Sequence, residues 1–461
     1  MHTSIYADSR GLSRRDFVRL AAGAAGLAGV AAAGATPAHA ALLQPGTPGK
    51  GVPAGDRPLK VGLIGCGGRG TGAAWQALNA DAGVVLHAVA DMFPDRLAGC
   101  LKALEAQAAE LRTQDPTKNL AGQIDVPAER RFTGFDGYKR LLECGYDVVL
   151  LCAYPHFRPA HLEAAVAAGC HVFCEKPMAV DAPGLRRVRA AAEAARARGL
   201  TLVSGFCWRY ADAERATYER IHAGAIGDLV TIHTTYHTST LSPRPRKPEW
   251  SDMEFQLRNW WHFTWLSGDH IVEQACHSID KICWAMRNTP PVRCVALGGR
   301  AARQGAESGH VFDHFAVVYE YEGGGRAFHT TRQIDHCPND NSDYVYGTTG
   351  SAEINGWKPV HEIRDRSGKV TWRYDGQRRD MYQNEHDELF RSVRAGHARN
   401  DGDFMCTSTM MSIMGRMAAY TGQTIGWDQA WKSEEDLTPA AYAMGPLTVP
   451  PVAVPGVTKF R

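Results

Sequence analysis

The sequence predicts two domains, an α/β domain with a doubly wound parallel sheet and then an α+β domain with a large, mostly antiparallel open sheet. Three observations favour this fold class. Short apolar strands alternate with helical stretches between residues 59 and 174, a pattern typical of a parallel sheet covered by helices. A glycine-rich turn follows the first of these strands. After about residue 210 the pattern changes to longer strand-like runs with few helices between them.

The first domain is expected to span residues 58–180. Its first strand leads into the glycine-rich turn, and strands and helices then alternate along the chain, which indicates βαβ units. The expected strands are 59–64, 84–90, 146–153 and 171–174, and the expected helices are 71–80, 94–111 and 159–168.

The second domain is expected to span residues 181–461. Its strand-like runs are separated by turns rather than by crossover helices, which favours antiparallel pairing. Two helical stretches near the C-terminus should pack back on the body of the protein. The expected strands are 229–236, 292–297, 314–321, 326–333 and 344–348, and the C-terminal helices are 384–395 and 403–420.

Composition excludes several classes of protein. The chain has 461 residues, of which 44% are hydrophobic and 22% charged, so it is a folded globular protein with a large core. Basic and acidic residues each number 47 after residue 40. Because duplex binding depends on clustered positive charge, this neutrality argues against a nucleic-acid partner.

The first 40 residues resemble an export signal. Ser13-Arg14-Arg15-Asp16-Phe17-Val18 precedes an apolar run from 20 to 35 and an Ala-x-Ala site ending at Ala40, as in a twin-arginine signal peptide. The alternative is a short membrane anchor, but the run is rich in Gly and Ala and short for a span. We expect cleavage after Ala40, a linker over 41–57, no stable membrane anchor and a periplasmic protein.

Export in the folded state affects two further expectations. Proteins that use this route commonly fold around a cofactor loaded in the cytoplasm, so we expect a tightly retained cofactor. The chain would fold in the reducing cytoplasm, so we expect its twelve cysteines to be mostly free, buried thiols rather than disulfides. Their spacing contains no C-x-x-C, so we expect no metal site.

The glycine-rich turn predicts a dinucleotide site. Gly65, Gly67 and Gly70 form G-x-G-x-x-G between a strand and a helix, with Gly68 and Arg69 in the same loop. These glycines allow a tight turn, a close approach of pyrophosphate and close helix packing. Asp91 ends the next strand, 26 residues after Gly65, where it would bind ribose hydroxyls and repel a 2′-phosphate. NAD is therefore favoured over NADP; the alternative is a tight turn without a ligand.

Two further motifs resemble the glucose-fructose oxidoreductase, inositol dehydrogenase and rhizopine catabolism family, usually written Gfo/Idh/MocA. Glu175-Lys176-Pro177 follows the expected fourth strand, and Gly268–Asp280 is similar to the family's D-x-G-x-H-x-x-D segment. The stretch 382–386 is typical of exported members. The resemblance covers essentially the whole chain after the leader, and it implies a Rossmann domain.

The resemblance also implies site residues. Lys176 and His277 would form the catalytic pair beside the nicotinamide, while Pro155, His156 and Glu175 would contact the cofactor. The chain departs from the family pattern at two positions, with Glu273 in place of the usual Asp and Ala275 in place of Gly. The longer side chain at 273 affects how substrate hydroxyls are held more than it affects the chemistry.

The chemistry of these residue types suits oxidation of an alcohol. His277, with an ordinary pKa near 6.5, can accept the hydroxyl proton, and Lys176 can stabilise alkoxide character. Glu273 precedes His277 by four residues, so on one helix both would face the same way. Each residue has a structural alternative: a packed core histidine, a lysine that caps a strand end, or a carboxylate that serves only as a hydrogen-bond partner.

Several residues are candidates for substrate binding. Asp269, His270 and Asp280 lie in the same segment and are equally compatible with structural roles. The aromatic run 259–265 includes Trp261 and Trp265, which could form a platform for a sugar ring or belong to the core. We expect a carbohydrate or polyol substrate and a homo-oligomer formed through the sheet of the second domain.

Three functions are compatible with the sequence. An exported enzyme has no obvious pool of free NAD, which favours a sugar oxidoreductase that keeps its cofactor in a closed redox cycle. The first alternative is a glycosidase in which NAD transiently oxidises a sugar hydroxyl so that the glycosidic bond breaks by elimination. A more remote alternative is a non-catalytic sugar-binding protein, which the presence of both Lys176 and His277 disfavours.

Overall fold

The computed structural model describes residues 57–461. The expected signal peptide (1–40) and the expected linker, apart from Arg57, lie outside the described residues. Within residues 57–461 no helix is both long and apolar enough to cross a membrane. All twelve cysteines fall in this range, and all are free thiols, nine of them buried.

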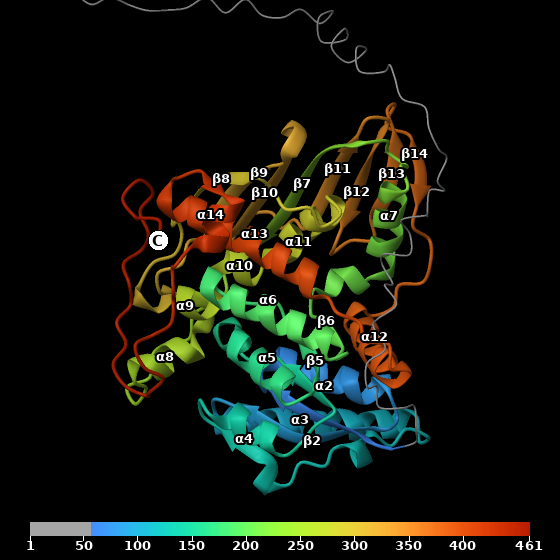
Figure 1. Cartoon of the computed structure of the whole chain (residues 1–461), viewed down its shortest axis with the longest axis vertical. Coiled ribbons are helices and arrows are strands. Elements are labelled where there is room, and N and C mark those ends of the chain that lie inside the picture. The colour runs from blue at the N-terminus through green and yellow to red at the C-terminus, as the bar shows by residue number, and fades with distance from the viewer. Residues whose placement is uncertain (1–56) are drawn as a thin grey trace, which may run out of the picture. The chain divides into compact units, whose positions relative to one another are not determined.

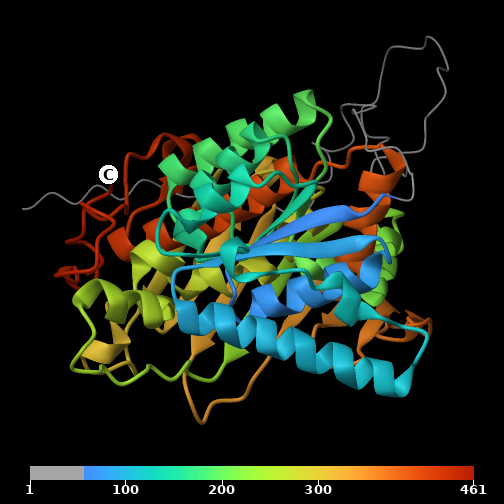
Figure 2. The ribbon, with the colours of Figure 1, turned by 90° about the horizontal axis from the view of Figure 1, so that it is seen from below.

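The first domain contains a parallel sheet that, within the described residues, has six strands in the order β3-β2-β1-β4-β5-β6. The apolar strands β4 and β5 are buried along their whole length because helices cover both faces (Figure 1). Figure 2 shows α3 on one side of this sheet and α5 and α6 on the other. The strands are β1 (Leu59–Ile64), β2 (Val84–Asp91), β3 (Arg131–Thr133), β4 (Val148–Leu151), β5 (His171–Cys174) and β6 (Leu202–Ser204), and the helices are α2 (Gly68–Ala80), α3 (Pro94–Gln114), α4 (Gly137–Glu143), α5 (Arg158–Ala167) and α6 (Ala182–Ala197).

The expected domain boundary at residue 180 is wrong. Strand β6 pairs in parallel with β5, with Val172 opposite Leu202, so the first domain includes helix α6 and extends past residue 204. The three residues of β6 are too few to show a strand pattern of their own. The strand forms because β5 presents an unpaired edge that its apolar residues can cover.

The second domain contains a sheet that, in residues 57–461, has nine strands in the order β14-β13-β12-β11-β7-β10-β9-β8-β15. Strands β7 and β10 pair in parallel, and the other neighbouring pairs are antiparallel. Both sheets confirm the predicted fold class. The strands are β7 (Leu229–Thr238), β8 (Arg293–Gly299), β9 (His314–Glu320), β10 (Arg326–Gln333), β11 (Ser342–Gly347), β12 (Gly350–Asn355), β13 (His361–Asp365), β14 (Val370–Arg373) and β15 (Ile425–Gly426).

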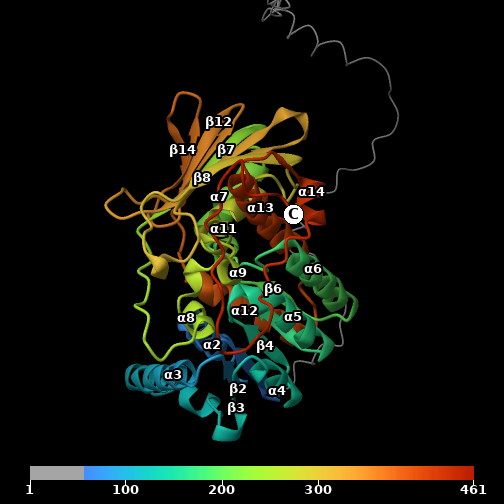
Figure 3. The ribbon, with the colours of Figure 1, turned by 90° about the vertical axis from the view of Figure 1, so that its left-hand side faces the viewer.

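Within residues 57–461, helices cover only one face of this sheet. Figure 3 shows α7, α11 and α13 on the same side of it, where Phe315, Val317 and Tyr319 of β9 are buried. On the opposite face Leu297 is 78% exposed and Phe328 is 38% exposed. The α-helices of this domain are α7 (Asp212–His222), α8 (Asp252–Arg258), α9 (Thr264–Ser267), α10 (His270–Glu273), α11 (Cys276–Ala285), α12 (Met381–Ala395), α13 (Gly402–Thr421) and α14 (Trp427–Lys432).

Short 3-10 helices occur in both domains. They are η2 (Leu120–Gln123), η3 (Ala128–Arg130), η4 (Pro155–Phe157), η5 (Cys207–Tyr210), η6 (Trp260–His262), η7 (Ala306–Ser308) and η8 (Glu322–Gly324).

The C-terminal segments tie the two domains together. Helix α12 packs against α2 of the first domain, and α13 packs between α6 and α11, as the sequence predicts. After α14 the chain continues without regular secondary structure. There the Tyr442 hydroxyl is 2.7 Å from Nε2 of His156, and the Gly445 carbonyl accepts a hydrogen bond from the backbone of Met253 in α8. The tail therefore contacts both domains.

Candidate active site

A cavity of about 610 Å³ lies at the carboxyl ends of the parallel strands and is lined by both domains. This edge of a parallel sheet is where α/β proteins bind ligands. The first domain contributes the glycine-rich loop, the end of β2, and the loops after β4 and β5. The second domain contributes residues of β7, η6, α10 and α11. The predicted site residues that line the cavity are Gly65, Gly67, Gly68, Arg69, Gly70, Asp91, Pro155, Glu175, Lys176, Trp261, Glu273 and His277.

The glycine-rich loop forms a cradle that side chains would fill. Gly65 has φ of +101°, and a Cβ there would lie 2.4 Å from the backbone nitrogen of Ala153. A Cβ on Gly70 would lie 1.7 Å from the carbonyl oxygen of Gly65. Around Gly67 and Gly68, in contrast, the space is open to 4 Å. Helix α2 begins at Gly68 without a side-chain cap, so its first N–H groups can bind an anion such as pyrophosphate.

Asp91 closes one end of this cradle. Its Oδ2 accepts a hydrogen bond from the Cys66 backbone at 2.6 Å, and its Oδ1 accepts one from the Phe93 backbone at 3.0 Å. Burial raises the pKa of Asp91, although these two hydrogen bonds oppose the shift. The remaining lone pairs can accept hydrogen bonds from ribose hydroxyls. The loop and Asp91 together fit a dinucleotide.

Lys176 and Glu273 meet across the boundary between the two domains. Lys176 follows β5, and its Nζ is 3.0 Å from Oε1 of Glu273 at the end of α10. The same ammonium donates to the main-chain carbonyl of Glu273. Burial alone disfavours the charged ammonium, but the adjacent carboxylate raises the pKa of Lys176 above its ordinary value. Lys176 is therefore a cation at neutral pH.

His277 faces the same cavity from the first turn of α11. The residue is 9% exposed, and its Nδ1 has no hydrogen-bond partner among residues 57–461. Burial, together with the positive charges of Lys176 and Lys281, lowers the pKa of His277 well below its ordinary value. The imidazole is therefore neutral at pH 7 and able to accept a proton.

Glu273 and His277 do not share one helix, contrary to the expectation from their spacing. Helix α10 ends at Glu273 and α11 begins at Cys276. Between them the Ala275 N–H bonds to the carbonyl of His270 five residues earlier, instead of four. This break directs the Glu273 side chain toward Lys176 and leaves His277 free to face the cavity.

Glu175 and Arg69 join the glycine-rich loop to the strand that bears Lys176. Oε1 of Glu175 is 3.0 Å from Nε of Arg69, and Oε2 accepts a hydrogen bond from the Lys176 backbone. The Arg69 guanidinium lies over the ring of Tyr382, 4.6 Å from its centre. Helix α12 thus supports the loop through Tyr382.

Two family models match the chain, one over the domain with the parallel sheet and one over much of the domain with the nine-stranded sheet. Residues 59–206 match the model described as "Oxidoreductase family, NAD-binding Rossmann fold", and residues 215–353 match the model of the "GFO/IDH/MocA C-terminal domain". The chain belongs to the Gfo/Idh/MocA family. The resemblance predicted from Glu175-Lys176-Pro177 and the Gly268–Asp280 segment is confirmed at the level of the family, and so is the Rossmann domain.

Curated relatives include inositol dehydrogenases. Inositol 2-dehydrogenase 3 of Saccharopolyspora erythraea is 27% identical over 269 residues, which are 58% of this chain and 64% of the relative. Inositol 2-dehydrogenase of Cereibacter sphaeroides is 30% identical over 190 residues, which are 41% of this chain and 48% of the relative. The matches thus span about half to somewhat under two thirds of these relatives' lengths.

Solved structures of Gfo/Idh/MocA-like fold cover most of this chain. An aldose-aldose oxidoreductase from Caulobacter crescentus, complexed with glycerol, has a TM-score of 0.61 at 18% identity and covers 80% of this chain and 100% of its own. Levoglucosan dehydrogenase, in complex with NADH and levoglucosan, has a TM-score of 0.60 at 17% identity and covers 81% and 100%. At these identities the likeness is one of fold.

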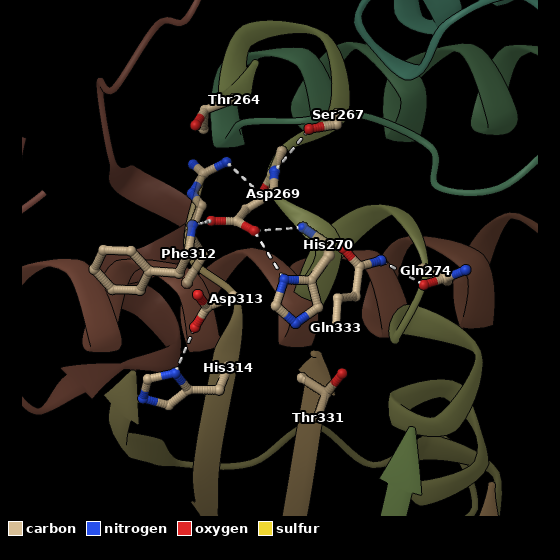
Figure 4. Close-up of polar contacts among 12 residues, drawn as sticks. Thr264, Ser267, Asp269, His270, Gln274, Phe312, Asp313, His314, Thr331 and Gln333 are labelled. Carbon is tan, nitrogen blue, oxygen red and sulfur yellow. Dashed lines mark hydrogen bonds and ion pairs between the residues drawn. The ribbon is translucent and has the colours of Figure 1, made fainter. Parts of the chain in front are cut away.

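Within this Gfo/Idh/MocA fold, Asp269 and His270 do not line the cavity, so the expectation that they contact substrate is corrected. Asp269 adopts φ of +74° and is fully buried. Its carboxylate accepts hydrogen bonds from the backbones of His270 and Phe312 and from the Tyr420 hydroxyl, at 2.5, 2.8 and 2.5 Å. Figure 4 shows the Asp269 carboxylate turned toward Phe312 and His270. Asp269 is the N-cap of α10 and thereby holds the start of this helix in place.

Three further expected residues also lie outside the cavity lining. The Asp280 carboxylate binds Arg209 at 2.7 Å and Ser408 at 2.6 Å and is buried. Trp265 is 7% exposed and donates its Nε1–H to Gln256, so it belongs to the core. His156 binds Tyr442 of the C-terminal tail, although the neighbouring Pro155 lines the cavity. The partners of Asp280 and His156 are distant in sequence, whereas Gln256 precedes Trp265 by nine residues.

The cavity also has lining residues that no sequence motif singles out individually. Trp260 stacks on Trp261 with ring centres 4.0 Å apart, and the pair lines the cavity together with His262, Gln274 and Tyr236. The aromatic run 259–265 was the only sequence signal for this wall. Within residues 57–461 no group of three or more His, Cys, Asp and Glu side chains could hold a metal ion.

Proposed function

We propose that this chain is an NAD-dependent oxidoreductase that acts on a secondary hydroxyl of a sugar, glycoside or polyol. The observation that carries the proposal is that Lys176 and His277 line the same cavity as the glycine-rich loop and Asp91. The inositol dehydrogenases among its relatives support a polyhydroxylated substrate. The stacked pair Trp260 and Trp261 gives the cavity an aromatic surface suited to the C–H face of such a substrate.

Each cavity residue has a distinct role in this proposal. The nicotinamide, when bound, supplies the acceptor for the hydride that leaves the substrate carbon. Neutral His277 accepts the proton of the substrate hydroxyl. The Lys176 ammonium stabilises negative charge that develops on that oxygen, and Glu273 holds the ammonium in place. Oε2 of Glu273, which has no hydrogen-bond partner among residues 57–461, is available to a second substrate hydroxyl.

We also propose that the cofactor is NAD and that it stays bound between turnovers in the periplasm. The twin-arginine signal predicted at Arg14 and Arg15 motivates the location, and the absence of a free NAD pool outside the cytoplasm motivates retention. Asp91 supports NAD over NADP because its carboxylate repels a 2′-phosphate.

The open face of the nine-stranded sheet supports the expected homo-oligomer. Leu297 of β8, Phe328 of β10 and Tyr346 of β11 are 78, 38 and 49% exposed, so large apolar groups from three strands meet solvent. Such a surface is typical of a protein–protein interface. We propose that a second copy of the chain covers it.

The proposed function is tested by following nucleotide and product together. The purified protein, when denatured, should release about one NAD or NADH per chain. Under anaerobic conditions, sugars, polyols and nitrophenyl glycosides are added one at a time while the 340 nm band and the release of nitrophenol are recorded. A 340 nm band without nitrophenol supports the oxidoreductase. Catalytic release of nitrophenol supports the NAD-dependent glycosidase, and neither signal with any compound contradicts the proposal.

Matched variants separate the site from the rest of the protein. His277→Ala should lower turnover by about 10² to 10⁴ and keep the nucleotide bound. His314→Ala is the control, because His314 lies on β9 with its side chain 44% exposed and does not line the cavity. Equal turnover in the two variants would contradict the assigned role of His277.

A further inference from the structure

Two cavity residues of the second domain depend on the same buried arginine. His262 ends η6, Gln274 follows α10, and both line the cavity. Arg303, in the turn after β8, is 6% exposed. It contacts His262 directly and reaches Gln274 through one intermediate residue, Gln333 of β10.

Arg303 imposes a direction on each of its hydrogen bonds. A guanidinium carries only donors, so every partner must accept. Its Nη1 is 2.9 Å from Nδ1 of His262, its Nη2 donates to Oε1 of Gln333, and its Nε donates to the Phe312 carbonyl at 3.1 Å. The partner atoms on His262 and Gln333 are thereby fixed as acceptors.

The contact with Arg303 sets the tautomer of His262. Because Nδ1 accepts, the ring proton of the neutral imidazole lies on Nε2. Burial and the positive charges of Arg303 and Arg300 lower the pKa of His262 to about 3, so the ring stays neutral at any working pH. Its Nε2–H has no partner among residues 57–461.

The same reasoning sets the orientation of the Gln274 amide. Since Oε1 of Gln333 accepts from Arg303, its amide nitrogen must donate, and that nitrogen is 2.6 Å from Oε1 of Gln274. Figure 4 shows the Gln333 amide turned toward Gln274. The NH₂ group of Gln274 is then left without a partner in the described part of the chain.

We propose that Arg303 is a positioning residue that presents His262 and Gln274 to the cavity as hydrogen-bond donors, and that the substrate meets them with acceptor oxygens. The inference rests on the proposed function and narrows its substrate class. Two donor groups beside the catalytic pair select a molecule that carries acceptor oxygens in addition to the hydroxyl being oxidised. A ring, glycosidic or carboxylate oxygen has this chemistry.

The tautomer of His262 tests the positioning step without any substrate. The whole chain after the expected cleavage site (residues 41–461) is labelled with ¹⁵N-histidine. The His262 signals are assigned from their loss in His262→Gln. We expect a proton on Nε2 and an acceptor Nδ1, and we expect this pattern to be lost in Arg303→Met. A proton on Nδ1 of the wild-type ring would overturn the inference, even if the protein is an active oxidoreductase.

Gln333→Glu tests the second donor with little change of shape. A carboxylate still accepts from Arg303 but cannot donate to Gln274, so the Gln274 amide must turn its oxygen toward the cavity. We expect KM for the best substrate to rise roughly tenfold, the loss of about one hydrogen bond, while kcat stays within about twofold and the NAD dissociation constant is unchanged. An unchanged KM would overturn the inference.

The control is Gln256→Glu. Gln256 is equally buried and also has two hydrogen-bond partners, Trp265 and Leu447, but it does not line the cavity. The Gln256→Glu variant should leave KM unchanged.

Analogues of the best substrate test which substrate oxygen is the acceptor. In these analogues the ring oxygen is replaced by CH₂, the glycosidic oxygen by sulfur or the carboxylate by an alcohol. For each analogue, KM of Gln333→Glu is divided by KM of wild type. The analogue for which this ratio is one lacks the oxygen that Gln274 binds. The same ratio for every analogue would contradict the proposal. If wild type oxidises no compound, the proposed function fails, while the His262 tautomer still tests the positioning.

Discussion

The Lys176 ammonium and the Glu273 carboxylate form an ion pair 3.0 Å long that joins the two domains at the cavity. Lys176 lies on the loop after β5 of the first domain, and Glu273 lies at the end of α10 in the second. Both side chains are largely buried, 13% and 5% exposed, so the attraction is weakly screened by solvent. The pair fixes the cation at the wall of the cavity.

Lys176→Met should reduce kcat by about 10² to 10⁴ while the bound nucleotide remains, because the cation acts on the reacting oxygen. Lys176 and His277 act on the same substrate hydroxyl, His277 on its proton and Lys176 on the charge left on its oxygen, so the double variant Lys176→Met/His277→Ala should be hardly worse than the poorer single variant. Steady-state rates and the nucleotide content of denatured protein measure both effects. Independent, multiplicative losses would show that the two residues do not work as a unit.

Glu273→Asp restores the residue that the family usually has at this position. The shorter side chain should change the relative kcat/KM values among sugars and polyols more than the maximal rate, because Glu273 positions groups instead of reacting. A panel of substrates measured with both enzymes checks this. A uniform loss of rate with unchanged substrate preference would contradict the assignment.

The cavity-lining residues of the first domain were predictable from sequence because their signals are local. Gly65, Gly70 and Asp91 have a fixed spacing within one βαβ unit, and Lys176 lies in a three-residue motif. The sequence could not show that Asp269 turns into the core, because its partner Phe312 is 43 residues away. Likewise, the link from Arg303 to His262 spans 41 residues and connects segments with no shared pattern.

The pH dependence of kcat/KM should report the environment of His277. The residue must be neutral to accept a proton, and burial with nearby cations lowers its pKa, so the rate should decline only well below pH 6.5. Lys281 is one of those cations, and it is paired with Asp343 at 3.0 Å. Lys281→Met combined with Asp343→Asn removes the cation and does not leave the buried Asp343 carboxylate without its ion-pair partner.

In that double variant the pKa of His277 should rise, so the acid limb of the profile should move to higher pH. Lys139→Met, which removes a cation whose side chain is 59% exposed, is the control and should leave the profile unchanged. An acid limb that stays in place in the double variant, or moves to lower pH, would rule out this electrostatic role for Lys281.

Asp91→Ser should shift the nucleotide preference toward NADP. Removal of the carboxylate relieves repulsion of a 2′-phosphate, and Arg96 and Arg244 line the same cavity. We expect the ratio of NADP to NAD affinity to rise at least roughly tenfold, equal to about 1.4 kcal/mol. Titration of nucleotide-free protein by intrinsic fluorescence measures both dissociation constants. Glu110→Gln, an exposed change farther along α3, should leave the ratio as it is.

The twin-arginine signal peptide predicted for residues 1–40 allows a separate test of location. With its leader intact, the protein should appear in the periplasm, cleaved near Ala40, when expressed in a host with a twin-arginine system. Arg14→Lys combined with Arg15→Lys should hold it in the cytoplasm, because that pathway reads the arginine pair. Cell fractionation and N-terminal sequencing provide the measurement. Normal export of the double variant would refute the assignment.

We propose that a hydride leaves a substrate carbon for the bound nucleotide while His277 takes the hydroxyl proton. The most direct test is one anaerobic turnover with a substrate deuterated at its carbons, followed by mass spectrometry of the extracted nucleotide. We predict reduced NAD that carries one deuterium and is one mass unit heavier than the product from unlabelled substrate, and almost none of it in His277→Ala. Reduced nucleotide without deuterium, or product formed on a protein that contains no nucleotide, would contradict the account.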